Sequence, residues 1–181
     1  MRNRVLPIAV AVAVVSGCSS SGGQTVTSFA AATCPVVMGW ADDSTTAVNE
    51  FEEQSPALAD AGARRALYEA TFARLDAAAA ALADRAASLP YPNKNGSEIR
   101  QRLDTMVTRV RSEYADDLKQ AQGLADDSYV NISVNNGLLF TGNEKAKAIV
   151  FETVGKLWED FKIVDENCGR HPPVTVDLKP G

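Results

Sequence analysis

The chain has 181 residues, of which 45% are hydrophobic and 23% charged, and its net charge at pH 7 is −5. This length allows one domain with a sizeable core. An acidic chain without a block of Lys or Arg is unsuited to binding nucleic acid or an anionic membrane surface, so we expect neither as a partner.

The first residues have the features of an export signal. A basic start, Met1 to Arg4, precedes an almost wholly apolar run from Val5 to Val15. The run has about eleven residues, whereas a membrane-spanning helix needs roughly twenty. Small residues then lead to Cys18. We therefore expect residues 1–17 to be a signal peptide that is removed.

Val15-Ser16-Gly17-Cys18 resembles the lipobox of bacterial lipoproteins. The resemblance implies that Cys18 receives a diacylglycerol thioether, with palmitate as a typical acyl chain, and that the peptide is cut just before it. A single acyl chain anchors only marginally, but two or three anchor stably. The implied location is the extracytoplasmic side of a cell membrane. Ser19 is compatible with the outer membrane if the host has two membranes.

Composition divides the rest of the chain into three parts. Residues 18–32 are rich in Ser, Gly and Thr and have few large apolar side chains. Such a segment cannot bury enough surface to offset its chain entropy, so we expect a flexible tether. We expect a folded domain over residues 33–169 and an extended, proline-containing tail over residues 170–181.

Three cysteines, less the lipidated Cys18, leave Cys34 and Cys168. An even remainder in an exported protein favours a disulfide. This bridge would close a loop of about 134 residues and contribute on the order of 4–5 kcal/mol in the chain-entropy model. A single histidine and the lack of C-x-x-C spacing argue against a zinc site, and we expect no metal or other cofactor.

Helical spacing of apolar residues predicts two helices in the first half of the domain. The first is expected to begin near Cys34, with Pro35 in its first turn, and to end near Gln54. The second is expected to begin at Ser55-Pro56, and its apolar residues follow a heptad pattern from Leu58 to Leu89.

Two further helices are predicted in the second half. One follows Asn95 or Ser97 and has an apolar stripe from Ile99 to Leu124. The other is expected to begin at a capping box formed by Thr141 and Glu144 and to end near Cys168. Between them, residues 126–140 are expected to form a long loop or a small hairpin, because Asn135-Asn136-Gly137 suits a tight turn.

The predicted fold is all-α, an antiparallel up-down-up-down four-helix bundle. In this arrangement the start of the first helix and the end of the fourth lie at the same end of the bundle. Cys34 and Cys168 occupy those places in the sequence, so the predicted topology and the predicted disulfide support each other.

The sequence contains no arrangement typical of catalysis. Its one histidine, His171, lies in the proline-containing tail, and no serine has a G-x-S-x-G context. We expect a non-enzymatic interaction module of the cell envelope, with an envelope protein of unknown identity as its partner. The apolar residues of the predicted loop are the candidate interaction surface: Tyr129, Ile132, Val134, Leu138 and Phe140.

Three alternatives remain open at this point. The predicted loop could be a packed cap that binds nothing. The bundle could carry a small apolar ligand in a cavity between its helices. A hydrolytic enzyme is the least favoured alternative, because the paired carboxylates of the sequence fit solvated helix faces and a bundle offers no cleft between them.

Overall fold

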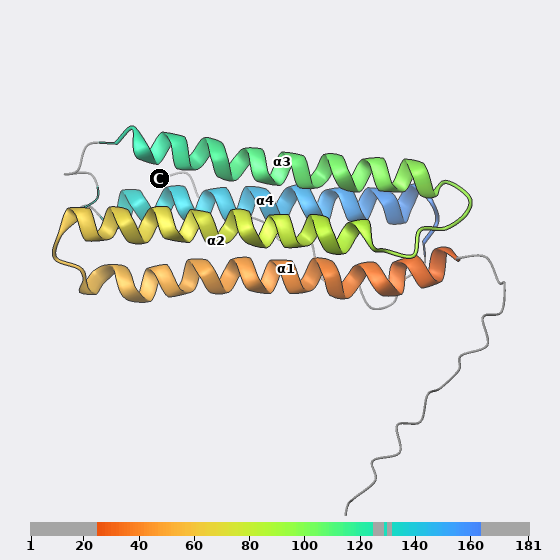
Figure 1. Ribbon diagram of the computed structural model, residues 1–181, viewed down its shortest axis with the longest axis horizontal. Helices are drawn as coiled ribbons and strands as arrows, with labels where there is room; N and C mark the ends of the chain where they lie inside the picture. Colours follow the sequence, from red (N-terminus) through yellow and green to blue (C-terminus); the bar gives the residue numbers. More distant parts are fainter. Residues whose placement is uncertain (1–24, 125–128, 130–131, 164–181) are drawn as a thin grey trace, which may run out of the picture.

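Four long helices lie side by side along the longest axis of the molecule in the computed structural model (Figure 1). The structure describes residues 25–124, 129 and 132–163, and it describes no side chains for residues 132–136. The helices are α1 (Val26–Gln54), α2 (Ala61–Ala87), α3 (Gly96–Gln122) and α4 (Ile132–Asp160), and a short 3₁₀ helix, η1 (Ser55–Ala57), follows α1. The described residues include no strand, which confirms the predicted all-α class.

Each helix packs against two others. Helix α1 contacts α2 and α4, and α3 contacts the same two helices from the other side. Phe29, near the start of α1, packs against Tyr91 and Trp158 with ring centroids 5.5 and 6.2 Å apart. The start of α1, the connection between α2 and α3, and the end of α4 therefore lie together. We call this the tether end.

The opposite end, which we call the distal end, contains the end of α1 and the start of α2. Phe51 and Tyr68 pack edge to face there, with ring centroids 5.5 Å apart. Tyr129, from the connection between α3 and α4, packs on Tyr68 at 6.0 Å. These pairings are the ones that an up-down-up-down connectivity requires, and that connectivity remains our interpretation.

The core is a single cluster to which all four helices contribute. The predicted apolar positions of α2 are buried from Tyr68 onward, and those of α3 are buried from Ile99 to Tyr114. Arg65, the charged residue in the seam of α2, is half-buried and pairs with Glu69 at 3.2 Å. Large side chains with almost no exposed surface fill the centre: Phe29, Trp40, Phe72, Leu75, Ile99, Met106 and Leu139.

Helix α1 begins eight residues earlier than predicted. Thr25 caps it, because its side chain accepts a hydrogen bond from the Ser28 N–H while Ser28 accepts one from the Thr25 N–H, both at 3.1 Å. Pro35 lies inside the helix rather than in its first turn. Residues 26–32, which we assigned to a flexible tether, are therefore helical. The physical reason is Phe29, whose complete burial against Tyr91 and Trp158 stabilises the extra turns.

Helix α2 begins later than predicted. Ser55 and Pro56 belong to η1, and Leu58 has an extended backbone that ends it. The N-cap of α2 is Asp60, whose side chain accepts a hydrogen bond from the Ala63 N–H at 2.8 Å. Pro56 supports a 3₁₀ turn here, and the aspartate, a favoured N-cap residue, determines where the long helix starts.

The predicted start of the fourth helix was wrong. Helix α4 begins at Ile132, so Thr141 and Glu144 lie well inside it and form no capping box. Asn135-Asn136-Gly137 is likewise helical, and the predicted hairpin does not form. Local propensity is a weak preference that tertiary packing overrides. Here the buried residues Leu139 and Gly142 hold the first half of α4 in the bundle.

Two of the three cysteines lie outside the described residues. Cys34 is buried in α1, at a position two turns from Val26, and Cys18 and Cys168 are among the residues that the structure leaves undescribed, as are the predicted signal peptide and tail. Helix α4 ends at Asp160 beside the start of α1, since Trp158 packs on Phe29. The bridge between Cys34 and Cys168 remains a prediction.

We expect alkylation of the mature protein in denaturant to label no thiol until a reductant is added, and then to label two. Cys34→Ser and Cys168→Ser should each lower the free energy of unfolding by about 4–5 kcal/mol, because each opens the same loop. The double variant should be no less stable than either single one. Two thiols that react without reductant would contradict the bridge.

Candidate functional site

Tyr129, the first residue of the predicted interaction surface, belongs to the core. Its side chain is 1% exposed, and its hydroxyl donates a hydrogen bond to the Ala121 carbonyl. Arg65 lies over its ring, 5.7 Å from the centroid, and Arg64 donates to the carbonyl of Leu58. The two arginines thus hold the connections at the distal end, and Tyr129 cannot contact a partner directly.

Phe140 is the large apolar side chain that stands exposed in the described part of the chain. It is 52% exposed and lies on α4, one residue after Leu139, which is completely buried. Leu138 is half-buried and packs against the core. The side chains of Ile132 and Val134 lie outside the described residues. Of the five predicted surface residues, Phe140 therefore has the exposure that an interaction residue needs.

An acidic side chain of α3, Asp117, is buried against the part of α4 that follows Phe140. Asp117 is 6% exposed, and its Oδ2 has no hydrogen-bond partner in the described structure. Gly142 faces this oxygen: a Cβ added to the glycine would lie 2.0 Å from it. Only a glycine allows α4 to approach α3 this closely with Asp117 in place.

The surroundings of Asp117 favour its neutral form. Burial raises the pKa of Asp117, and Lys145, whose Nζ lies 4.0 Å from Oδ1, lowers it in part. Nearby, the hydroxyl of Tyr114 donates a hydrogen bond to Oδ1 of Asn143 at 3.1 Å. Tyr68, on α2, is also buried with an unpartnered hydroxyl, and its pKa is raised first by burial and then by Asp117.

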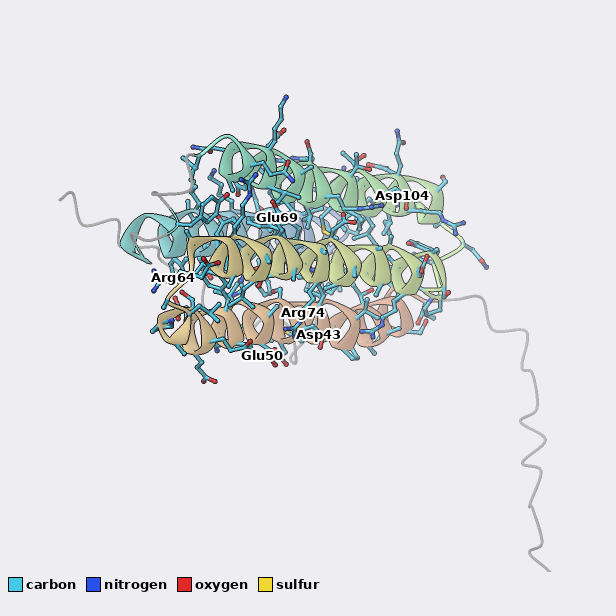
Figure 2. All side chains as sticks on the ribbon, turned by 60° about the vertical axis from the view of Figure 1, so that its left-hand side comes forward. Asp43, Glu50, Arg64, Glu69, Arg74 and Asp104 are labelled. Atoms are coloured by element: carbon cyan, nitrogen blue, oxygen red, sulfur yellow. The ribbon has the colours of Figure 1, made fainter. Side chains whose placement is uncertain are left out.

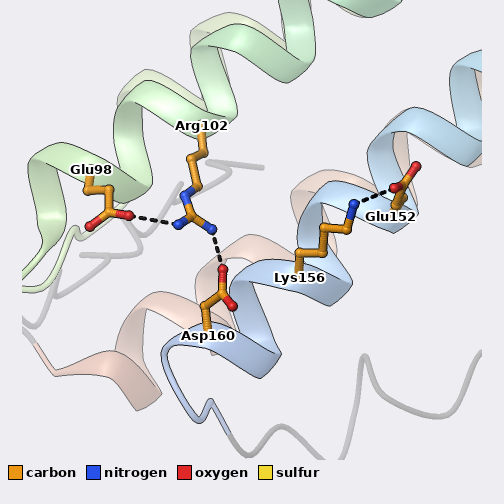
Figure 3. Close-up of polar contacts among 5 residues, drawn as sticks. All are labelled: Glu98, Arg102, Glu152, Lys156 and Asp160. Carbon is orange, nitrogen blue, oxygen red and sulfur yellow. Dashed lines mark hydrogen bonds and ion pairs between the residues drawn. The ribbon is translucent and has the colours of Figure 1, made fainter.

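A groove of about 300 Å³ lies on the surface between α3 and α4. Its lining is mostly polar and comprises Gln101, Arg102, Thr105, Met106, Arg109, Glu152, Thr153 and Lys156. Figure 3 shows the side chains beside the groove. Arg102 forms ion pairs with Glu98 of its own helix and with Asp160 of α4, and Lys156 forms one with Glu152. Of these ion pairs, the one between Arg102 and Asp160 connects the two helices beside the groove.

Arg102 and Lys156, two cations of this groove, are paired with carboxylates. The bonds to Asp160 and Glu98 raise the pKa of Arg102, and the hydrogen bond from Lys156 lowers the pKa of Glu152. Arg109 is the third cation of the lining, in which Glu152 is the one carboxylate. Glu98 and Asp160, which pair with Arg102, lie beside the groove rather than in its lining.

Other charged side chains form exposed surface pairs. Arg74 of α2 reaches Glu50 of α1 on the face seen in Figure 2, and Arg111 of α3 pairs with Asp76 of α2 at 2.7 Å. Exposed pairs of this kind typically contribute about 0–1 kcal/mol each. Within the described ranges, no three residues among His, Cys, Asp and Glu gather in a way that would bind a metal ion.

Sequence reasoning missed Asp117, because Asp116 and Asp117 are one of the carboxylate pairs that we assigned to solvated helix faces. A signal for it exists: Asp117 follows Tyr114 by three residues and Val110 by seven, and it precedes Ala121 by four. It therefore lies on the buried stripe. An aspartate is usually exposed to solvent, whereas the position of Asp117 on the apolar stripe predicts burial. The structure agrees with the position.

Comparison with known proteins identifies no relative: no family model, curated protein or solved structure matches the chain.

We expect Gly142→Ala to destabilise the protein by about 1–3 kcal/mol, since the new methyl group would displace the Asp117 carboxylate from its buried position. In an Asp117→Ala background the same change should cost much less, which makes the pair strongly non-additive in a double-mutant cycle. Gly155 on α4 is the matched control, because a Cβ there meets nothing within 4 Å. Gly155→Ala should stabilise by up to about 1 kcal/mol. Equal effects of the two alanines in chemical denaturation would contradict the close contact.

Proposed function

We propose that this protein is a lipid-anchored lipoprotein of the bacterial cell envelope and acts as a non-enzymatic interaction module. The lipobox-like residues before Cys18 support the anchor. None of the helices in the described part of the chain is long and apolar enough to cross a bilayer. The observation that carries the interaction role is Phe140, a half-exposed aromatic side chain on α4 in the segment where the sequence predicts a binding surface.

The bundle would hold its distal end away from the membrane. With α1 beginning at Val26, only residues 18–25 separate the lipidated cysteine from the first helix, and a span of this length reaches at most about 25–30 Å. Helix α1 has 29 residues and is therefore about 43 Å long. The short tether would keep the tether end near the lipid and present the distal end to the surrounding envelope.

A protein partner with an apolar pocket fits this arrangement better than a small ligand or a substrate. An aromatic side chain buries a large area on binding, and aromatic residues are enriched among those that dominate interface energetics. Exposure of Phe140 also means that its function can be tested apart from folding. The groove between α3 and α4 gives no support to a carrier of apolar ligands, because charged side chains line it.

The anchor is tested by changing Cys18. We expect Cys18→Ser to abolish labelling of the protein by a palmitate analogue and to move it from the membrane fraction to the soluble fraction of fractionated cells. Cys34→Ser, which leaves the lipobox intact, is the matched control and should stay in the membrane fraction. A Cys18→Ser protein that remains membrane-bound would contradict the lipid anchor.

The interaction surface is tested by photo-crosslinking in cells. A benzophenone amino acid at position 140 should give a discrete crosslinked band, and the same probe at exposed Thr108 of α3 should not. Phe140→Ser should reduce co-purification of the crosslinked partner at least tenfold, yet lower the free energy of unfolding by about 1 kcal/mol or less, because about half of the side chain is exposed. Equal crosslinking at both positions, or none at position 140, would count against this surface.

A further inference from the structure

The contact between Asp117 and Gly142 has the elements of a pH-sensitive device. An acidic side chain with an unpartnered oxygen lies between two helices, with 6% of its surface exposed. The glycine opposite leaves the space that the carboxylate occupies, since a Cβ at this position would lie 2.0 Å from Oδ2. A buried charge without full pairing is costly, whereas a neutral carboxyl group is tolerated.

We propose that the protonation state of Asp117 controls how firmly the first half of α4 packs against α3. When Asp117 is neutral, its side chain remains buried against Gly142. When it is ionised, the carboxylate draws in water or turns toward Lys145, and the contact with α4 loosens. Gly142 follows Phe140 by two residues, so the loosened segment includes the exposed aromatic side chain.

Every element packed around Asp117 contributes groups that affect its charge. Helix α4 contributes Lys145, the single cation within 4.0 Å of the carboxylate in the described structure. Helix α2 contributes Tyr68, whose buried, unpartnered hydroxyl interacts with Asp117. From α3 itself, Glu113 and Asp116 oppose ionisation by like-charge repulsion. Lys145 thus lowers the pKa of Asp117, whereas burial and the two neighbouring carboxylates raise it. The raising effects are the larger, so the pKa is raised overall.

The direction of the pH effect follows from this balance. The pKa of Asp117 is higher in the folded protein than its ordinary value of 3.8. Between those two values the folded chain holds a proton that the unfolded chain has lost, so stability falls as pH rises through this window. The stabilising effect of the neutral carboxyl is fully present below the unfolded value and is lost above the folded one.

Hydrogen exchange on the purified mature protein tests the proposal. Amide protection would be measured by mass spectrometry over residues 137–150 between pH 4 and pH 8, with each rate corrected for the intrinsic pH dependence of exchange. In the wild-type protein we expect protection to fall as pH rises, by about tenfold for each pH unit that separates the folded and unfolded pKa values of Asp117. Asp117→Asn should remove this dependence.

Glu113→Gln is the matched control, because Glu113 lies at the same 4.0 Å from the Lys145 ammonium group as Asp117 but is less buried. This variant should keep a pH dependence, smaller than that of the wild type and moved to lower pH, because it removes one of the charges that raise the pKa of Asp117. If Asp117→Asn fails to fold, ¹³C NMR titration of the wild-type carboxyl groups replaces it. An Asp117 carboxyl that titrates at or below the ordinary aspartate value, wild-type protection that does not change with pH, or an Asn variant with the wild-type slope would each overturn the proposal.

An effect of this contact on partner binding rests on the proposed function of Phe140, whereas the exchange experiment does not. Loss of crosslinking at position 140 would leave the pH-dependent protection unchanged. Conversely, flat exchange profiles would leave the interaction surface standing and remove only its regulation.

Discussion

Burial of one apolar stripe from each of four helices in a common core is the constraint on which this molecule depends. Isolated helices are marginal in water, and most helical stability in proteins comes from tertiary packing of an amphipathic face. This explains why α1 tolerates Pro35 and why α4 includes Asn135-Asn136-Gly137. Once Phe29 and Leu139 are buried, the helix must continue through residues that would otherwise favour a turn.

The two ends of the bundle use this core differently. At the tether end, Phe29 packs between Tyr91 and Trp158, and the Tyr91 hydroxyl donates to the Ala86 carbonyl. At the distal end, buried polar groups accompany the aromatic side chains: Asp117, Tyr68, Tyr114 and Asn143. Buried polar groups carry a free-energy cost that depends on their partners and their charge. Asp117 is the charged member of this group, and for that reason we propose the distal end as the pH-sensitive part of the bundle.

The same contrast organises the proposed function. The acyl chains and the short tether would restrict the tether end, so the proposed recognition would fall to the distal part of the bundle. Phe140 adds an apolar contact on the outside of α4, and Asp117 lies on the inside against the same helix. Beside the groove between α3 and α4, by comparison, the ion pair between Arg102 and Asp160 connects the two helices.

Helical periodicity is a local property, and for that reason the sequence alone determined the helical class, the buried faces of α2 and α3, and the end of α1 at Gln54. It did not determine where α1, α2 and α4 begin, because a helix start depends on contacts made by residues that are distant in the chain. Phe29 against Trp158 extends α1, and Gly142 against Asp117 holds the first half of α4 in the bundle. Nor could residue type reveal that Asp117 and Tyr129 are buried while Phe140 is exposed. Exposure is decided by which helix lies opposite, and only the tertiary structure brings those surfaces together.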